Sequence, residues 1–193
     1  MAKPKSNKKE IILNRSSELF RTRGYSATSM RDIADAVGME AASLYNHIKS
    51  KADLLREIVF AIAADCNQHL DTITSGPQGN TEKIEAVIRF HIQLMIARFN
   101  EYYVMTHDWH HLAEPHLLSF AHQRRAYVQQ LEAIIQDGID KGEFRNIIPY
   151  VAVLNILSAV MGLEFWQRSA KRYSEQQMED NIVLHLLSGL KQG

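Results

Sequence analysis

The sequence predicts an all-α protein. Almost every periodic segment repeats its apolar residues at helical spacing, and no alternating polar and apolar run is long enough to indicate a strand. The 193 residues are 46% hydrophobic, which is enough to bury a substantial core. We therefore expect helices packed as one large domain, or as a small module joined to a larger one.

The first quarter of the chain predicts three short helices. The first covers residues 8–23 and ends at Gly24, because glycine readily takes the left-handed conformation that closes a helix. The second begins after Ser29, which has an aspartate three positions later as in a capping box. Gly38 permits a tight turn, and a third helix is expected over residues 41–47. Two short helices joined by such a turn are typical of a helix-turn-helix.

The middle of the chain continues the helical pattern. Ser50 is a candidate N-cap for a long apolar helix, and residues 75–80 (SGPQGN) form the clearest loop. Thr81 is expected to cap the next helix. A further helix is predicted over residues 102–113, ending before Pro115, because proline disfavours helical geometry in the residue that precedes it.

The last third predicts three more helices. A long one runs through residues 118–135, and Pro149 is suited to the first turn of the next. That next helix is apolar on nearly every side, so it must be covered by this chain or by a second copy. The final helix begins at a capping box on Ser174 and is expected to stop at Gly189. We expect these last two helices, residues 149–168 and 175–188, to form a homodimer interface.

The net charge of zero hides an asymmetry. Residues 1–56 carry 11 basic and 6 acidic side chains, whereas the rest carry 11 and 16. A basic head on an acidic body indicates one face that binds a polyanion. The single cysteine, Cys66, cannot form an intramolecular disulfide, which indicates a reducing cytoplasm. No apolar run near 18 residues is apparent, so no membrane span is expected.

The segment from residue 41 to 51 carries the groups expected to meet DNA. Helical spacing places Ala42, Tyr45, Asn46 and Lys49 away from the apolar side of the third helix, where they can reach phosphates or base edges. Lys51 opens the following helix, whose positive dipole end suits a phosphate.

The stretch SSELFRTRGYSATSMRDIADAVGMEAASLYNHIKSKADLL, residues 16–55, resembles the TetR-like repressors. The resemblance implies a homodimer with a DNA-binding domain over residues 1–50 and a ligand-binding and dimerisation domain over residues 51–193. It also implies that Thr28, Tyr45, His47 and Lys51 contact phosphates and that residues 40–46 read bases. The full set of candidate DNA-binding residues is Thr28, Ser29, Glu40, Ala41, Ala42, Ser43, Tyr45, Asn46, His47, Lys49 and Lys51.

Two residues depart from the family pattern. Glu40 stands where the family usually has a small capping residue, so its carboxylate either repels phosphate or accepts a hydrogen bond from a cytosine amine. Ile48 replaces the usual phenylalanine, which is expected to change only packing. Repression is inferred from family habit, and the small residues at 41–43 offer little direct base readout.

The resemblance also implies a small-molecule inducer that spreads the DNA-binding heads apart. We expect a largely apolar pocket with a few polar tips. Similar stripes of methionine and aromatic residues are more often plain core. The candidate ligand-binding residues are His91, Met95, Phe99, Tyr103, Trp109, Met161, Phe165 and Trp166.

The sequence raises three alternative functions. His107 and His111 lie four positions apart and could bind a divalent metal ion, which would make the protein a metal-responsive regulator. The second alternative is a DNA-binding dimer with no small-molecule input. The third is an enzyme, which we do not expect, because the chain lacks a G-x-S-x-G elbow, a phosphate-binding glycine loop and H-E-x-x-H. No cofactor is expected.

Overall fold

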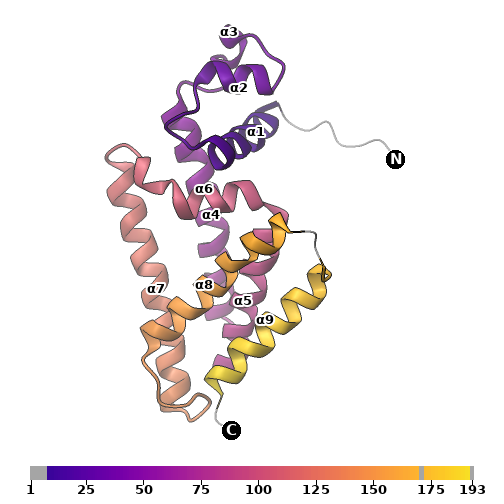
Figure 1. The fold of residues 1–193 in the computed structure, drawn as a ribbon. Coiled ribbons are helices and arrows are strands. Elements are labelled where there is room, and N and C mark those ends of the chain that lie inside the picture. Colours follow the sequence, from indigo (N-terminus) through magenta and orange to yellow (C-terminus); the bar gives the residue numbers. More distant parts are fainter. Residues whose placement is uncertain (1–7, 170–171, 192–193) are drawn as a thin grey trace. The chain divides into compact units, whose positions relative to one another are not determined.

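The computed structural model describes residues 8–169 and 172–191 (Figure 1). These residues form helices and turns, and their only extended pairing is an isolated bridge between Phe144 and Lys191. The all-α prediction is confirmed. The helices are α1 (Lys8–Arg23), α2 (Met30–Ala36), α3 (Ala41–Leu44), α4 (Lys51–Thr74), α5 (Asn80–Ala97), α6 (Phe99–His107), the 3₁₀ helix η1 (Trp109–His111), α7 (His116–Asp140), α8 (Pro149–Arg168) and α9 (Glu175–Leu190).

The chain folds into two compact units. Unit 1 contains the residues up to Ala64 together with Asn100–Phe120, and unit 2 contains Asp65–Phe99 and the residues from Ala121 onwards. The packing therefore divides the chain at other points than residue 50, because the segment 100–120 packs with the N-terminal helices. We call unit 1 the head and unit 2 the body.

The turn glycines and the capping box predicted for the head are present in the structure. Gly24 has φ +88°, and its amide donates to the Phe20 carbonyl at 2.8 Å. Ser29 caps α2 in a reciprocal capping box with Asp32. Gly38 has φ +66° and closes the turn between α2 and α3.

A single apolar core holds the head together. Side chains from α1, α2, α3 and the first half of α4 meet side chains from α6, η1 and α7. The segment 100–120 is thus part of the compact unit that carries α3. The largest contributors are Ile12, Phe20, Ile33, Leu44, Ile48, Leu54, Leu55, Ile58, Leu112 and Phe120.

In the body, α8 and α9 both pack against α5 (Figure 1). The core of the body includes Cys66, whose burial raises the pKa of its thiol to about 12. The predicted cap at Thr81 was wrong: α5 begins at Asn80 with Gly79 as N-cap, and the Gly79 amide donates to Glu82. The Thr81 amide instead donates to the Glu143 carboxylate at 3.0 Å, a contact 62 residues away in sequence.

Two further helix predictions need correction. The helix expected over residues 102–113 starts earlier, at Phe99, ends at His107 and is followed by η1. α9 passes through Gly189 to Leu190, because Gly189 does not take the left-handed conformation that ends a helix. The predicted starts at Pro149 and Ser174 are confirmed.

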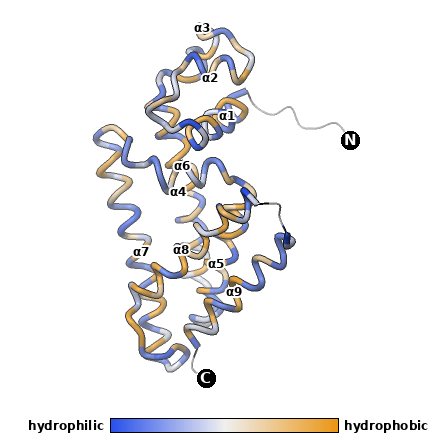
Figure 2. Tube along the Cα trace, viewed as in Figure 1, coloured by the Kyte–Doolittle hydropathy of each residue, from blue (hydrophilic) through white to orange (hydrophobic). Residues whose placement is uncertain are grey.

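α8 is the most apolar of the long helices in the described part of the chain (Figure 2). Its 20 residues include a window with mean hydropathy 1.4, only a third of which is buried, so by length and composition it passes a test for a membrane span. The expectation that no such segment exists was therefore wrong. A helix of this composition is equally typical of a core or of a subunit interface, where apolar residues occupy most of the helix surface.

Candidate nucleic-acid interface

The segment from Ala41 to Lys49 presents most of its side chains to solvent. Leu44 and Ile48 are the exceptions, because they are buried in the head core and anchor the segment from beneath. α3 itself ends at Leu44, but Ile48 N still donates to Leu44 O at 3.1 Å, so a helical turn continues beyond the regular helix. The exposed groups of this reading segment are Ala41, Ala42, Tyr45, Asn46, His47 and Lys49.

Glu40 occupies the N-cap of α3 without acting as a side-chain cap. Its carboxylate is exposed and accepts no capping hydrogen bond from the first turn. Glu40, which stands where the family usually has a small capping residue, therefore leaves the start of α3 without a side-chain cap. Ser43 is partly buried, and Ser29 is exposed and forms the capping box of α2 with Asp32.

Two of the candidate phosphate contacts have internal partners. Thr28 is 1% exposed, and its hydroxyl donates to the Gly24 carbonyl at 2.9 Å. The Lys51 ammonium donates to the carbonyls of Tyr25 and Thr28, each at 2.8 Å, and to Ser26 at 3.4 Å. Both side chains thus bind the turn that joins α1 to α2.

Tyr25 lies at the centre of this turn. Its ring packs edge-on against Phe20 and stacks on His111, each with centroids 5.1 Å apart. The Lys51 ammonium sits 4.4 Å from the ring centroid, within the range of a cation–π contact. Burial raises the pKa of the Tyr25 hydroxyl, and the nearby Asp108 carboxylate adds to this. No sequence signal indicates this cluster, because its members lie up to 91 residues apart, from Phe20 to His111.

The predicted ligand-binding residues do not all fall in one compact unit. Tyr103 and Trp109 belong to the head, where Tyr103 stacks on His107 and Trp109 packs against Phe120. The other six belong to the body. Phe165 is 80% exposed, which does not fit an enclosed pocket within this chain.

His91 is the most buried of the polar candidates. Its Nε2 lies 2.7 Å from the Tyr127 hydroxyl, and burial lowers the pKa of the imidazole to about 4. Met95 and Trp166 are also buried, and the Trp166 indole donates to the Tyr173 carbonyl at 3.2 Å. Phe99 and Met161 are partly buried.

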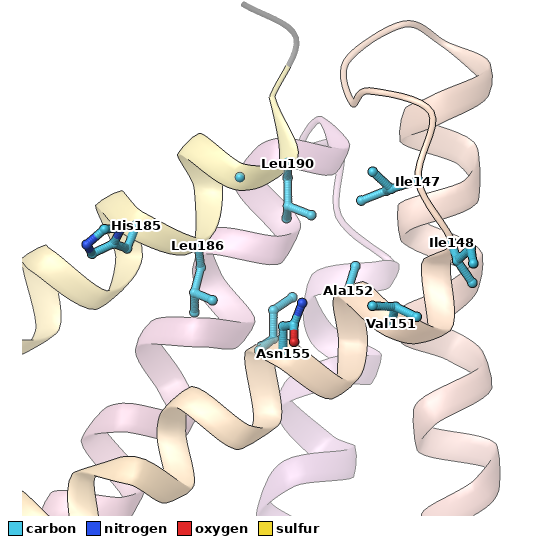
Figure 3. Close-up of a pocket in the computed structure, with 10 residues that line it drawn as sticks. Ile147, Ile148, Val151, Ala152, Asn155, His185, Leu186 and Leu190 are labelled. Atoms are coloured by element: carbon cyan, nitrogen blue, oxygen red, sulfur yellow. The ribbon is translucent and has the colours of Figure 1, made fainter.

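A groove of about 570 Å³ opens between α8 and α9 in the body (Figure 3). Leu186 and Leu190 from α9 and Ala152 and Asn155 from α8 line it. None of the eight predicted ligand-binding residues does so. Helical spacing could have indicated the two apolar faces, but not that they meet.

The described residues bring no group of three histidine, cysteine or acidic side chains together in a way that could hold a metal ion. His107 Nδ1 lies 3.1 Å from the Tyr103 carbonyl and 2.9 Å from the Thr106 hydroxyl, while His111 stacks on Tyr25. The described residues therefore give no support to a metal site at His107 and His111.

A helix-turn-helix with an exposed reading segment, joined to a larger helical body, defines a DNA-binding transcriptional regulator. Two family models match the chain: "Bacterial regulatory proteins, tetR family" over residues 12–58, and "Tetracyclin repressor-like, C-terminal domain" over residues 77–190. The second covers more than half of the sequence. The chain belongs to the TetR family.

Three relatives extend this result along the whole chain. The transcriptional repressor KstR2 of Mycolicibacterium smegmatis is 25% identical over 193 residues, covering 97% of this chain and 92% of the relative. The structure of AibR in complex with isovaleryl coenzyme A and operator DNA matches with 25% identity and a TM-score of 0.81, covering 94% and 98% of the two chains. The ketosteroid regulator KstR2 of Mycobacterium tuberculosis matches in fold with a TM-score of 0.89 and 20% identity, covering 100% and 99%. The predicted resemblance and fold class are confirmed.

Proposed function

We propose that this protein is a ligand-responsive repressor that binds a palindromic operator as a homodimer and is released by a small, largely apolar molecule. The observation that carries the DNA-binding part is the reading segment, where Tyr45, Asn46 and His47 are exposed above a buried Leu44 and Ile48. A rigid core beneath exposed polar groups allows a recognition helix to enter a major groove without unfolding. Such a regulator acts in the cytoplasm on double-stranded DNA.

The proposed dimer uses α8 and α9. No Asp, Glu, Lys or Arg occurs from residue 149 to residue 163, although much of this stretch faces solvent in the single chain. Protein interfaces are depleted of charge at their centre, and a large exposed apolar patch marks an interaction site. The exposed large apolar side chains of this region are Ile148, Tyr150, Val151, Leu154, Phe165 and Leu184.

A dimer in which two heads face the same side of a duplex requires half-sites separated by one helical turn, roughly 34 Å, or by a multiple of it. An inducer releases the protein only if it binds the conformation that cannot span these half-sites more tightly than the one that can. The proposed inducer carries an apolar body, in keeping with the isovaleryl group bound by AibR and the steroid class named for KstR2.

One experiment in two successive steps tests the proposal. The unmodified protein first enriches duplexes from a randomised 30-bp library, and the enriched sequence is inspected for two inverted half-sites. Isovaleryl coenzyme A is then added to the complex, with coenzyme A alone as control. Inverted half-sites and release by the thioester but not by coenzyme A support the proposal. A single unrepeated half-site argues against the dimer, and unchanged binding with a series of acyl-coenzyme A thioesters argues against this inducer class.

The second candidate function is that of a DNA-binding dimer with no small-molecule input. The groove between α8 and α9 lies within the proposed dimer surface, so a second copy is expected to fill it. Melting curves with the same thioesters distinguish the two functions, because a ligand that binds the folded protein raises its melting temperature.

A further inference from the structure

Lys51 stands at the first position of α4, where a cation is poorly placed. The N-terminal end of a helix carries a partial positive charge, so an ammonium group there is disfavoured unless other groups stabilise it. In this chain the stabilising groups are backbone carbonyls of the turn between α1 and α2. The turn, in return, gains partners for carbonyls that belong to no regular helix.

The Lys51 ammonium has no donor left for another ligand. A lysine side chain offers three N–H donors and no acceptor. Two of them reach the carbonyls of Tyr25 and Thr28 at 2.8 Å, and the third points to Ser26 at 3.4 Å. The Tyr25 ring covers the ammonium at 4.4 Å from its centroid. A DNA phosphate could bind this group only by displacing contacts within the head.

The same turn is held from its other end by Thr28. The buried Thr28 hydroxyl donates to the Gly24 carbonyl, which fixes the chain just before the capping box of α2. Lys49, two residues before Lys51, is placed differently. Its side chain is exposed, and none of the hydrogen bonds and ion pairs described for residues 8–169 and 172–191 involves it. Lys49 therefore provides the control for Lys51, because the two share the same charge but not the same contacts.

We propose that Lys51 is a positioning residue, which holds the turn of residues 25–28 against α4 and so orients the reading segment, and that it does not contact DNA. This assignment departs from the phosphate contact that the family resemblance implies for this position. It rests on DNA binding by the head, which the unmodified protein must display before any variant is compared.

The first test separates a phosphate contact from a positioning role by its salt dependence. Binding of a 30-bp duplex, enriched from a random library by the unmodified protein, is measured over a range of sodium chloride concentrations for K49A, K51M and K51R. Each lost phosphate contact lowers the slope of log affinity against log salt by about 0.9. We expect this change in K49A, with an unchanged melting temperature.

K51M is expected to keep the wild-type salt slope, to melt at a lower temperature and to bind roughly two- to thirtyfold more weakly, the range for residues that act without touching the ligand. K51R is expected to behave like K51M, because a planar guanidinium cannot direct three donors at converging carbonyls. A phosphate contact would instead survive in K51R. Wild-type affinity in K51R, or a slope lowered by about 0.9 in K51M at unchanged melting temperature, would overturn the assignment.

The second test needs no DNA, so its result does not depend on the proposed function. Amide hydrogen exchange of the whole protein is compared between K51M, K49A and the unmodified chain. Faster exchange confined to the turn and the start of α2 in K51M, and absent in K49A, supports the positioning role. Unchanged exchange in that turn contradicts it. Failure of the unmodified protein to enrich any duplex would instead count against DNA binding itself.

Discussion

The Tyr127 hydroxyl lies 2.7 Å from Nε2 of His91 inside the body, where His91 is fully buried. Burial lowers the pKa of this imidazole from the usual 6.5 to about 4. An unfolded chain therefore takes up a proton on His91 at a higher pH than the folded protein does. The pair stabilises the fold only while the imidazole is neutral.

This arrangement predicts an acid-sensitive body. The contribution of His91 is complete above pH 6.5 and is lost as the pH falls towards 4, because the unfolded state then binds the extra proton. The free energy of unfolding should drop by roughly 3 kcal/mol over this interval. Chemical denaturation at several pH values measures the drop, and the double variant H91F/Y127F should lack most of it. An equal drop in that variant would mean that other groups cause the acid sensitivity.

Tyr45 is predicted to contact a phosphate of the DNA backbone. Its side chain is 52% exposed, so Y45A should leave the fold within about 0.5 kcal/mol of the unmodified protein. Loss of one hydrogen bond to a phosphate should weaken binding by about 1 kcal/mol, roughly fivefold, on every duplex sequence alike. Fluorescence anisotropy with operator and random duplexes checks this, with Y45F as the control that removes only the hydroxyl. Full affinity of Y45A at physiological salt would contradict the assignment.

Leu184 on α9 is predicted to lie in the dimer interface. It is 65% exposed in the single chain, and burying an aspartate carboxylate in an apolar interface is costly unless an opposite charge pairs with it. L184D should therefore raise the dimer dissociation constant by about 30-fold or more, since an unpaired polar group costs roughly 2 kcal/mol or above on burial. Sedimentation velocity at micromolar concentration measures the change, and Q129D on the exposed side of α7 is the control. A monomeric unmodified protein would rule out the interface.

Gly38 is predicted to be replaceable only by residues that tolerate the left-handed region. Its φ is +66°, although a Cβ at this position would meet nothing within 4 Å. G38A should lower stability by about 1 kcal/mol through backbone strain alone, and G38N by less, because asparagine visits this region more readily. Thermal denaturation compares the two. Equal melting temperatures for G38A and the unmodified protein would show that the turn relaxes.

The capping boxes at Ser29 and Ser174 and the glycine turn at Gly38 could be predicted from sequence, because each depends on residues within four positions of one another. Thr81 shows the limit of such signals. A threonine before an apolar helix is a good cap in isolation, but the Glu143 carboxylate, distant in sequence, binds its amide instead.

The candidate DNA-binding site also has features that could be predicted from the sequence and features that could not. Exposure of Tyr45, Asn46 and Lys49 followed from helical spacing around Leu44 and Ile48, since one helix face determines the other. The internal contacts of Lys51 did not, because they need the position of a turn that lies 23 to 26 residues earlier.

The sequence by itself determined that this is an all-α TetR-family regulator, because helical periodicity, caps and the motif over residues 16–55 are properties of neighbouring residues. Only the tertiary structure decided that residues 100–120 complete the head and that α8 and α9 leave a groove between them. It alone also brought Tyr25 into contact with both Lys51 and His111. These contacts join residues far apart in the chain, and the packing of whole helices brings them together.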